Sequence, residues 1–81
     1  MLDYLLSEPL PPVSLDLPGR LRLFRRRHGL TQKQVAFLLQ IDRTAYTCYE
    51  NGKAQPKIDA LAKLSLFYHV SMDDLIGIER A

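Results

Sequence analysis

Apolar residues recur every three or four positions along most of this 81-residue chain, in short blocks separated by residues that end helices. The first block holds Leu17, Leu21 and Phe24, and Gly29 follows it at the position of a helix C′ residue. The alternation typical of strands is present only weakly, near residues 13–17. The sequence therefore predicts an all-α fold built from short helices.

Capping residues set the bounds of five helices. Thr31 followed by Gln34 forms a capping-box pattern, and Asp42 and Ser71 are suitable N-cap residues for later helices. We expect helices over residues 18–28, 32–39, 43–51 and 58–68, and a short last helix after Ser71. The fourth helix carries a predicted inner stripe of Ile58, Leu61, Leu64 and Tyr68, and the last one buries Met72, Leu75 and Ile76.

The helices form one domain with a leading arm. A chain of this length suffices for a single core, and 47% apolar with 25% charged residues is typical of a globular protein. Residues 1–16 are apolar, acidic and proline-containing, so we interpret them as an N-terminal arm and residues 17–78 as the helical domain.

Cys48 is the only cysteine and no Cys/His group has zinc-ligand spacing, so we expect no metal, no cofactor and a reducing cytoplasm.

Positive charge is concentrated in the middle of the chain. Residues 1–17 carry a net charge of −3, residues 18–63 carry +7 and residues 64–81 carry −2. A basic body of this kind suits a polyanion, because each Lys or Arg on a phosphate releases a condensed counterion. A solvated helix face explains the same charge equally well, so charge alone leaves both interpretations open.

The predicted helix over residues 43–51 has two distinct faces. Ala45, Tyr46 and Tyr49 gather on one side, and the opposite side consists of Arg43, Thr44, Thr47, Cys48 and Asn51. Small polar side chains and an arginine suit the major groove of DNA, where arginine can pair with guanine and methyl groups can contact thymine. This pattern favours DNA binding over a solvated face.

The chain resembles the Cro and phage-repressor type of helix-turn-helix family over about residues 17–76. The matching pieces are the arginine-rich first helix, Leu30-Thr31-Gln32, Val35-Ala36, Ile41, Tyr49-Glu50-Asn51-Gly52-Lys53, Pro56, and Val70-Ser71 before Leu75. The resemblance implies a five-helix, lambda-repressor-like domain whose third helix enters the major groove. It also implies a structural ion pair between Arg25 and Glu50.

The resemblance assigns DNA contacts by position. It implies base contacts from Arg43, Thr44, Thr47 and Cys48, and backbone contacts from Gln32, Asn51 and Lys53. The family usually has glycine where this chain has Gln40, so we expect Gln40 to be left-handed, with roughly 1 kcal/mol of strain.

Several apolar residues fall on predicted outer faces: Leu23, Phe37, Leu38, Leu66 and Phe67. Either the apolar arm or a partner protein covers them.

The sequence thus predicts a small bacterial or phage transcriptional regulator, of the repressor type, that binds double-stranded DNA as a homodimer in the cytoplasm. The alternative is an antitoxin-like or regulatory protein-interaction module on the same fold. We expect no enzyme activity, because no acid–base pair or nucleophile constellation is evident, and no membrane association.

Overall fold

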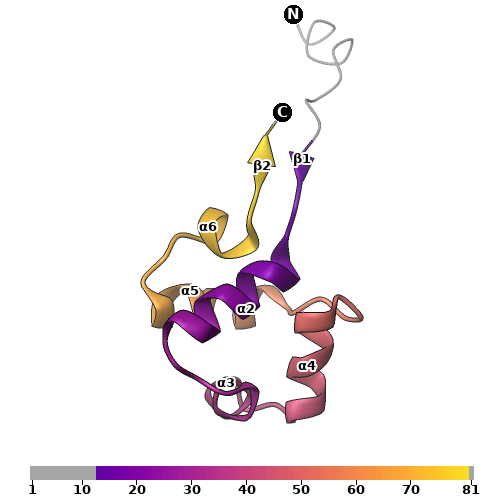
Figure 1. Ribbon diagram of the computed structural model, residues 1–81, viewed down its shortest axis with the longest axis vertical. Helices are drawn as coiled ribbons and strands as arrows, with labels where there is room; N and C mark the ends of the chain where they lie inside the picture. Colours follow the sequence, from indigo (N-terminus) through magenta and orange to yellow (C-terminus); the bar gives the residue numbers. More distant parts are fainter. Residues whose placement is uncertain (1–12, 81) are drawn as a thin grey trace, which may run out of the picture.

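The computed structural model describes residues 13–80 and contains five helices (Figure 1). They are α2 (Leu17–Arg27), α3 (Gln32–Leu39), α4 (Arg43–Asn51), α5 (Ile58–Tyr68) and α6 (Met72–Ile76). Two residues at each end, β1 (Val13–Ser14) and β2 (Glu79–Arg80), form a short antiparallel pair with Val13 opposite Arg80. The all-α prediction is confirmed, and the strand pair was not predicted because it joins segments at opposite ends of the chain.

The capping pattern explains where three of the helices begin. The Thr31 hydroxyl accepts from the Gln34 amide at 3.1 Å, and the Gln34 side chain accepts from the Thr31 amide at 2.8 Å. Ser71 accepts from the amide of Asp74 at 3.0 Å, and Asp16, which the sequence analysis did not single out, caps α2 through the amide of Gly19. These bonds satisfy first-turn donors that have no partner within the helix.

The predicted N-cap position of Asp42 in α4 is confirmed, but its side chain does not cap the helix. Asp42 occupies the N-cap position with extended backbone, but its carboxylate accepts no capping hydrogen bond. The residue is exposed, so water can solvate the carboxylate in place of the backbone amides.

Two helices end at non-glycine residues with left-handed backbone. Gln40 has φ of 58°, as expected from its place in the turn between α3 and α4. His69, at the end of α5, has φ of 56°, which the sequence did not predict. Such a conformation strains any residue with a Cβ.

A core of nine residues joins the five helices: Leu21, Phe24, Val35, Ala36, Leu39, Tyr46, Leu64, Tyr68 and Leu75. Ile58, which was predicted to extend the inner stripe of α5, is 77% exposed. It lies in the first turn of α5, whereas the buried residues of that helix, Leu64 and Tyr68, belong to its second half. Met72 and Ile76 are only partly buried, beside the wholly buried Leu75.

The helices are arranged so that α4 is held from two sides. In Figure 1, α2 crosses the middle of the molecule, with α3 and α4 beneath and beside it and α5 behind it. α4 packs against both α2 and α3, and α2 packs also against α6. This arrangement fixes α4 at the edge of the body, with one of its faces turned away from the core.

Candidate nucleic-acid interface

The exposed face of α4 carries the residues that the sequence assigned to base contacts. Arg43 and Thr44 are exposed at the amino end of the helix, and Thr47 and Cys48 are half-buried in its middle. The opposite side is anchored by Tyr46, whose side chain is wholly buried. Burial raises the pKa of Tyr46 far above its ordinary value, and the nearby Glu50 carboxylate adds to this effect. The phenol is therefore neutral and acts as a packing residue.

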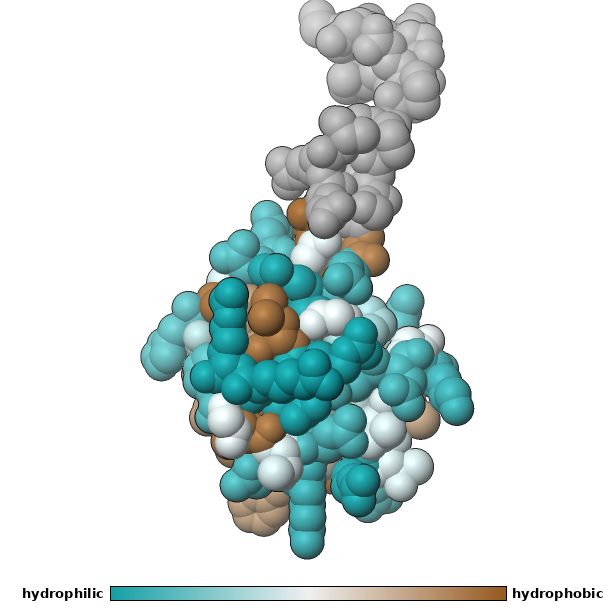
Figure 2. All heavy atoms as spheres, in the orientation of Figure 1, coloured by the Kyte–Doolittle hydropathy of each residue, from teal (hydrophilic) through white to brown (hydrophobic). Residues whose placement is uncertain are grey.

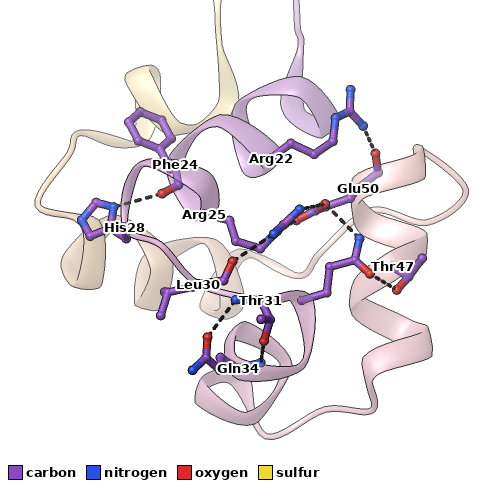
Figure 3. Close-up of polar contacts among 10 residues, drawn as sticks. Arg22, Phe24, Arg25, His28, Leu30, Thr31, Gln34, Thr47 and Glu50 are labelled. Atoms are coloured by element: carbon purple, nitrogen blue, oxygen red, sulfur yellow. Dashed lines mark hydrogen bonds and ion pairs between the residues drawn. The ribbon is translucent and has the colours of Figure 1, made fainter.

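Arg25 of α2 and Glu50 of α4 form a two-point ion pair (Figure 3). Arg25 Nε donates to Glu50 Oε2 at 2.6 Å and Nη2 donates to Oε1 at 3.1 Å, while Nη1 donates to the carbonyl of Leu30 at 2.9 Å. The Glu50 side chain is 1% exposed and that of Arg25 is 12% exposed. This paired geometry joins α2, α4 and the turn before α3, and so sets the orientation of α4.

Glu50 stays ionised in spite of its burial. Burial is the largest single influence and raises the pKa of Glu50, but hydrogen bonds from Arg25 and Gln32 and the positive charge of Arg25 outweigh it. The pKa of Glu50 is therefore lowered overall. The hydrogen bond to Glu50 in turn raises the pKa of Arg25.

Gln32 and Thr47 extend this network toward the exposed face of α4. Gln32 Nε2 donates to Glu50 Oε1 at 3.1 Å, and the Thr47 hydroxyl donates to Gln32 Oε1 at 2.9 Å. Arg22 of α2 donates to the backbone carbonyl of Glu50. The sequence predicted none of these three bonds, because they join residues 15 to 28 positions apart and the matching groups have no local signal. We call Arg25, Glu50, Gln32 and Thr47 the Glu50 network.

A shallow cleft of about 490 Å³ lies at the amino end of α3. Its lining residues are Arg25, Leu30, Thr31, Gln32, Lys33 and Arg43. Three of them are cationic, and the cleft lies beside the first turn of an eight-residue helix, whose unpaired amides and dipole favour an anion. The predicted backbone contacts Asn51 and Lys53 are exposed at the other end of α4.

Hydrophilic side chains cover much of the face that carries α2. In Figure 2 they form a broad band across the centre of the molecule, over α2 and toward α4. Five arginines belong to this helix: Arg20, Arg22, Arg25, Arg26 and Arg27. Arg22 and Arg25 reach α4 through Glu50, whereas Arg20 donates to the backbone carbonyl of Asp74 in α6.

A different surface is apolar. Phe37 is 82% exposed, Leu38 42%, Leu66 76% and Phe67 41%. Phe37, Leu38 and Phe67 line an open groove of about 430 Å³, together with Leu30, Lys33 and Gln34. We call Phe37, Leu38, Leu66 and Phe67 the α3–α5 apolar surface.

Leu23 does not belong with these residues. It was predicted to be outward-facing, but it is half-buried in α2, which packs against both α4 and α6. The arm that was predicted to cover the apolar side chains comprises residues 1–16, of which residues 1–12 lie outside the described part of the chain.

Comparison with known proteins matches residues 21–75 to the Helix-turn-helix family. The chain is 37% identical over 65 residues to the HTH-type transcriptional activator BcrR of Enterococcus faecalis, covering 80% of this chain and 32% of BcrR. A transcriptional regulator from Listeria innocua is 30% identical, with a TM-score of 0.76, covering 79% of this chain and 60% of that structure. The restriction-modification controller protein C.AhdI from Aeromonas hydrophila is 29% identical, with a TM-score of 0.65, covering 73% of this chain and 89% of C.AhdI.

The chain spans between a third and about half the length of the first curated relatives that it matches. Within residues 13–80, no helix combines the length and the apolar character needed to cross a membrane.

Proposed function

The chain belongs to the Cro/C1-type helix-turn-helix family, and from this we propose that it regulates transcription by binding double-stranded DNA with α4 in the major groove. The observation that carries the proposal is the division of α4. Its inner side is fixed by Tyr46 and by the ion pair of Glu50, and its outer side presents Arg43 and Thr44 without a covering element in the described residues. A rigid helix with small polar side chains and an exposed arginine suits the groove.

We assign specificity to four residues of α4: Arg43, Thr44, Thr47 and Cys48. Arg43 is exposed at the amino end of the helix, the part that enters deepest in helix-turn-helix proteins. It can donate two hydrogen bonds to guanine O6 and N7. The other three side chains are short enough to let the helix approach the bases closely.

We assign affinity to three phosphate contacts: Gln32, Asn51 and Lys53. Gln32 acts through its backbone N–H at the start of α3, because its side-chain amide is already bonded to Glu50 and Thr47. Lys33 and Arg43, which line the same cleft, add positive charge for the phosphate. Asn51 and Lys53 hold the DNA backbone beyond the other end of α4.

Selection of bound duplexes from a random pool tests this function. We expect enrichment of one sequence, with an affinity that falls steeply as the salt concentration rises, because phosphate binding releases counterions.

We further propose a cytoplasmic homodimer of bacterial or phage origin, with residues 17–78 as its DNA-binding unit and residues 1–16 as an arm. Enriched sites should then be palindromes with half-site centres about 34 Å apart. Binding of all sequences alike would contradict the proposed specificity.

A second candidate function is protein interaction, and the α3–α5 apolar surface favours it. Phe37 and Leu66 are more exposed than large apolar residues commonly are in a monomer. An antitoxin-like or other regulatory partner would cover them. A chain with this function alone should bind random duplex DNA without a steep dependence on salt, which separates it from the first proposal.

A further inference from the structure

Within the proposed DNA-binding function, on which this inference rests, we infer that Glu50 determines how Thr47 contacts DNA. The Glu50 network commits the only hydroxyl proton of Thr47 to Gln32, so Thr47 meets a base pair with its methyl group and its oxygen lone pair. It therefore selects an A·T pair and donates no hydrogen bond to DNA.

Glu50 is a buried carboxylate that is paired with Arg25. Its carboxylate is 1% exposed and receives two hydrogen bonds from Arg25, at 2.6 and 3.1 Å. An ionised carboxylate can only accept hydrogen bonds. Every neighbour that bonds to Glu50 must therefore present a donor.

Glu50 fixes the orientation of the Gln32 side-chain amide. The nitrogen and oxygen of a glutamine amide can exchange places by rotation, and the hydrogen-bonding environment decides which arrangement holds. Because Glu50 Oε1 lies 3.1 Å from Gln32 and only accepts, the amide must present its NH₂ group to Glu50. The Gln32 carbonyl oxygen is then turned toward Thr47.

The hydrogen bond between Thr47 and Gln32 can then have only one direction. The Thr47 hydroxyl lies 2.9 Å from Gln32 Oε1, which has no proton to give. Thr47 must donate its single hydroxyl proton to Gln32. What remains for a ligand is the γ-methyl group and the free lone pair of the hydroxyl oxygen.

These two groups match one kind of base pair. In the major groove an A·T pair presents the thymine methyl group and the adenine N6 amino donor, whereas a G·C pair presents the cytosine N4 amino donor and the guanine acceptors N7 and O6. The lone pair of Thr47 can accept from adenine or cytosine but not from guanine, so the contact of its methyl group with the thymine methyl is what favours an A·T pair. Thr47 is therefore suited to an A·T pair.

The test uses the full chain and the duplex selected by the wild-type protein. Each thymine of that duplex is replaced in turn by deoxyuracil, which lacks only the methyl group. We expect one thymine in each half-site whose replacement weakens wild-type binding about fourfold, the effect of losing one buried methyl contact. Thr47→Ser should lose this sensitivity. Thr47→Val should bind more weakly than wild type but keep it.

A matched control and a second variant complete the design. Thr44→Ser, a change of the same kind at an exposed threonine of α4, should leave the sensitivity at the Thr47 thymine intact. Gln32→Met removes the acceptor, frees the Thr47 hydroxyl to donate to guanine N7 or O6, and should weaken the preference for A·T over G·C at that position. Circular dichroism checks that each variant is folded.

The outcomes separate the inference from the function beneath it. If the wild type selects no sequence, the proposed function fails and the inference fails with it. If the wild type selects a site but Thr47→Ser keeps the sensitivity to deoxyuracil, or the Thr47 position prefers guanine, only the inference is overturned. An unchanged preference in folded Gln32→Met would overturn the role of the network.

Discussion

The Glu50 network and the α3–α5 apolar surface share one helix, α3, and differ in how their side chains are partnered. Gln32, in the first turn of α3, is bonded on both sides, to Glu50 and to Thr47. Phe37, farther along the same helix, is 82% exposed. The first region contains charged and polar groups with partners inside the protein, and the second contains apolar groups without cover in the described residues.

Folding requires the contacts of the Glu50 network but not the side chains of the α3–α5 apolar surface. A buried carboxylate without its arginine is costly, so the network must form whenever the helices pack. An exposed phenylalanine contributes little to the stability of this fold, so its presence points to something outside the domain. Variants of the two regions should therefore differ in stability and in binding.

Removal of one partner of the ion pair should have the largest effect. Glu50→Ala leaves the Arg25 guanidinium, 12% exposed, without its counter-charge and should lower the free energy of unfolding by about 3 kcal/mol. The double variant Arg25→Met with Glu50→Leu should be less destabilised than Glu50→Ala alone, because it leaves no unpaired charge. Urea unfolding measures both. Equal losses in the two proteins would mean that packing, and not the charge, sets the cost.

Acid should weaken the network before it weakens the apolar core. The pKa of Glu50 is lowered in the folded protein, so its ionised form stabilises the fold. That stability is fully present above the ordinary carboxyl pKa of 4.5 and is lost as the pH falls through the lower, folded pKa. Urea unfolding below pH 4.5 should therefore show a steeper decline for the wild type than for Glu50→Gln. Parallel declines would assign acid sensitivity to other carboxyl groups.

Two basic residues should separate specificity from affinity at the face that the network supports. Arg43→Ala should relax the sequence preference and cost about 1–3 kcal/mol on the selected site. Lys53→Ala should weaken binding to all sequences alike and flatten the salt dependence. Fluorescence titrations of specific and random duplexes at two salt concentrations measure both effects. Unchanged discrimination in Arg43→Ala would remove its assignment as a base contact.

The apolar surface should respond differently from the core, even within one helix. Leu66 is 76% exposed and Leu64 is 1% exposed, both in α5. Leu66→Ala should change the free energy of unfolding by less than about 0.5 kcal/mol, whereas Leu64→Ala should cost about 2–5 kcal/mol. A large loss in Leu66→Ala at a protein concentration where the wild type self-associates, and none at high dilution, would identify the surface as a subunit interface.

The sequence predicted the helices of this fold well because their signals are local. Apolar spacing, the Thr31–Gln34 capping box and the glycines after helices each act within a few residues, and the helices over residues 32–39, 43–51 and 58–68 have the predicted bounds. Ile58 was misplaced because periodicity does not indicate where along a helix the core ends. Asp42 was misjudged because a residue suited to capping can instead be solvated.

The site was predictable in its residues but not in its bonds. The faces of α4 follow from helical geometry, and the resemblance to a known family suggested that Arg25 and Glu50 would meet. The bonds from Gln32 to Glu50 and from Thr47 to Gln32 depend on how α3 and α4 cross. The pairing of β1 with β2 likewise depends on both ends of the domain meeting. Such contacts have no signature in either segment alone.

A small stabilising effect is expected at the turn between α3 and α4. Gln40 connects α3 to α4 with φ of 58°, a conformation that costs a residue with a Cβ roughly 1–2 kcal/mol. Gln40→Gly removes this strain but gives the unfolded chain more freedom, which offsets about 0.4–1 kcal/mol of the gain. We expect a net stabilisation of about 0.5 kcal/mol by urea unfolding. His69→Gly, with the same backbone conformation at the end of α5, is the matched control and should gain a similar amount. A gain at His69 but a loss at Gln40 would show that the glutamine side chain itself contributes to the turn between α3 and α4.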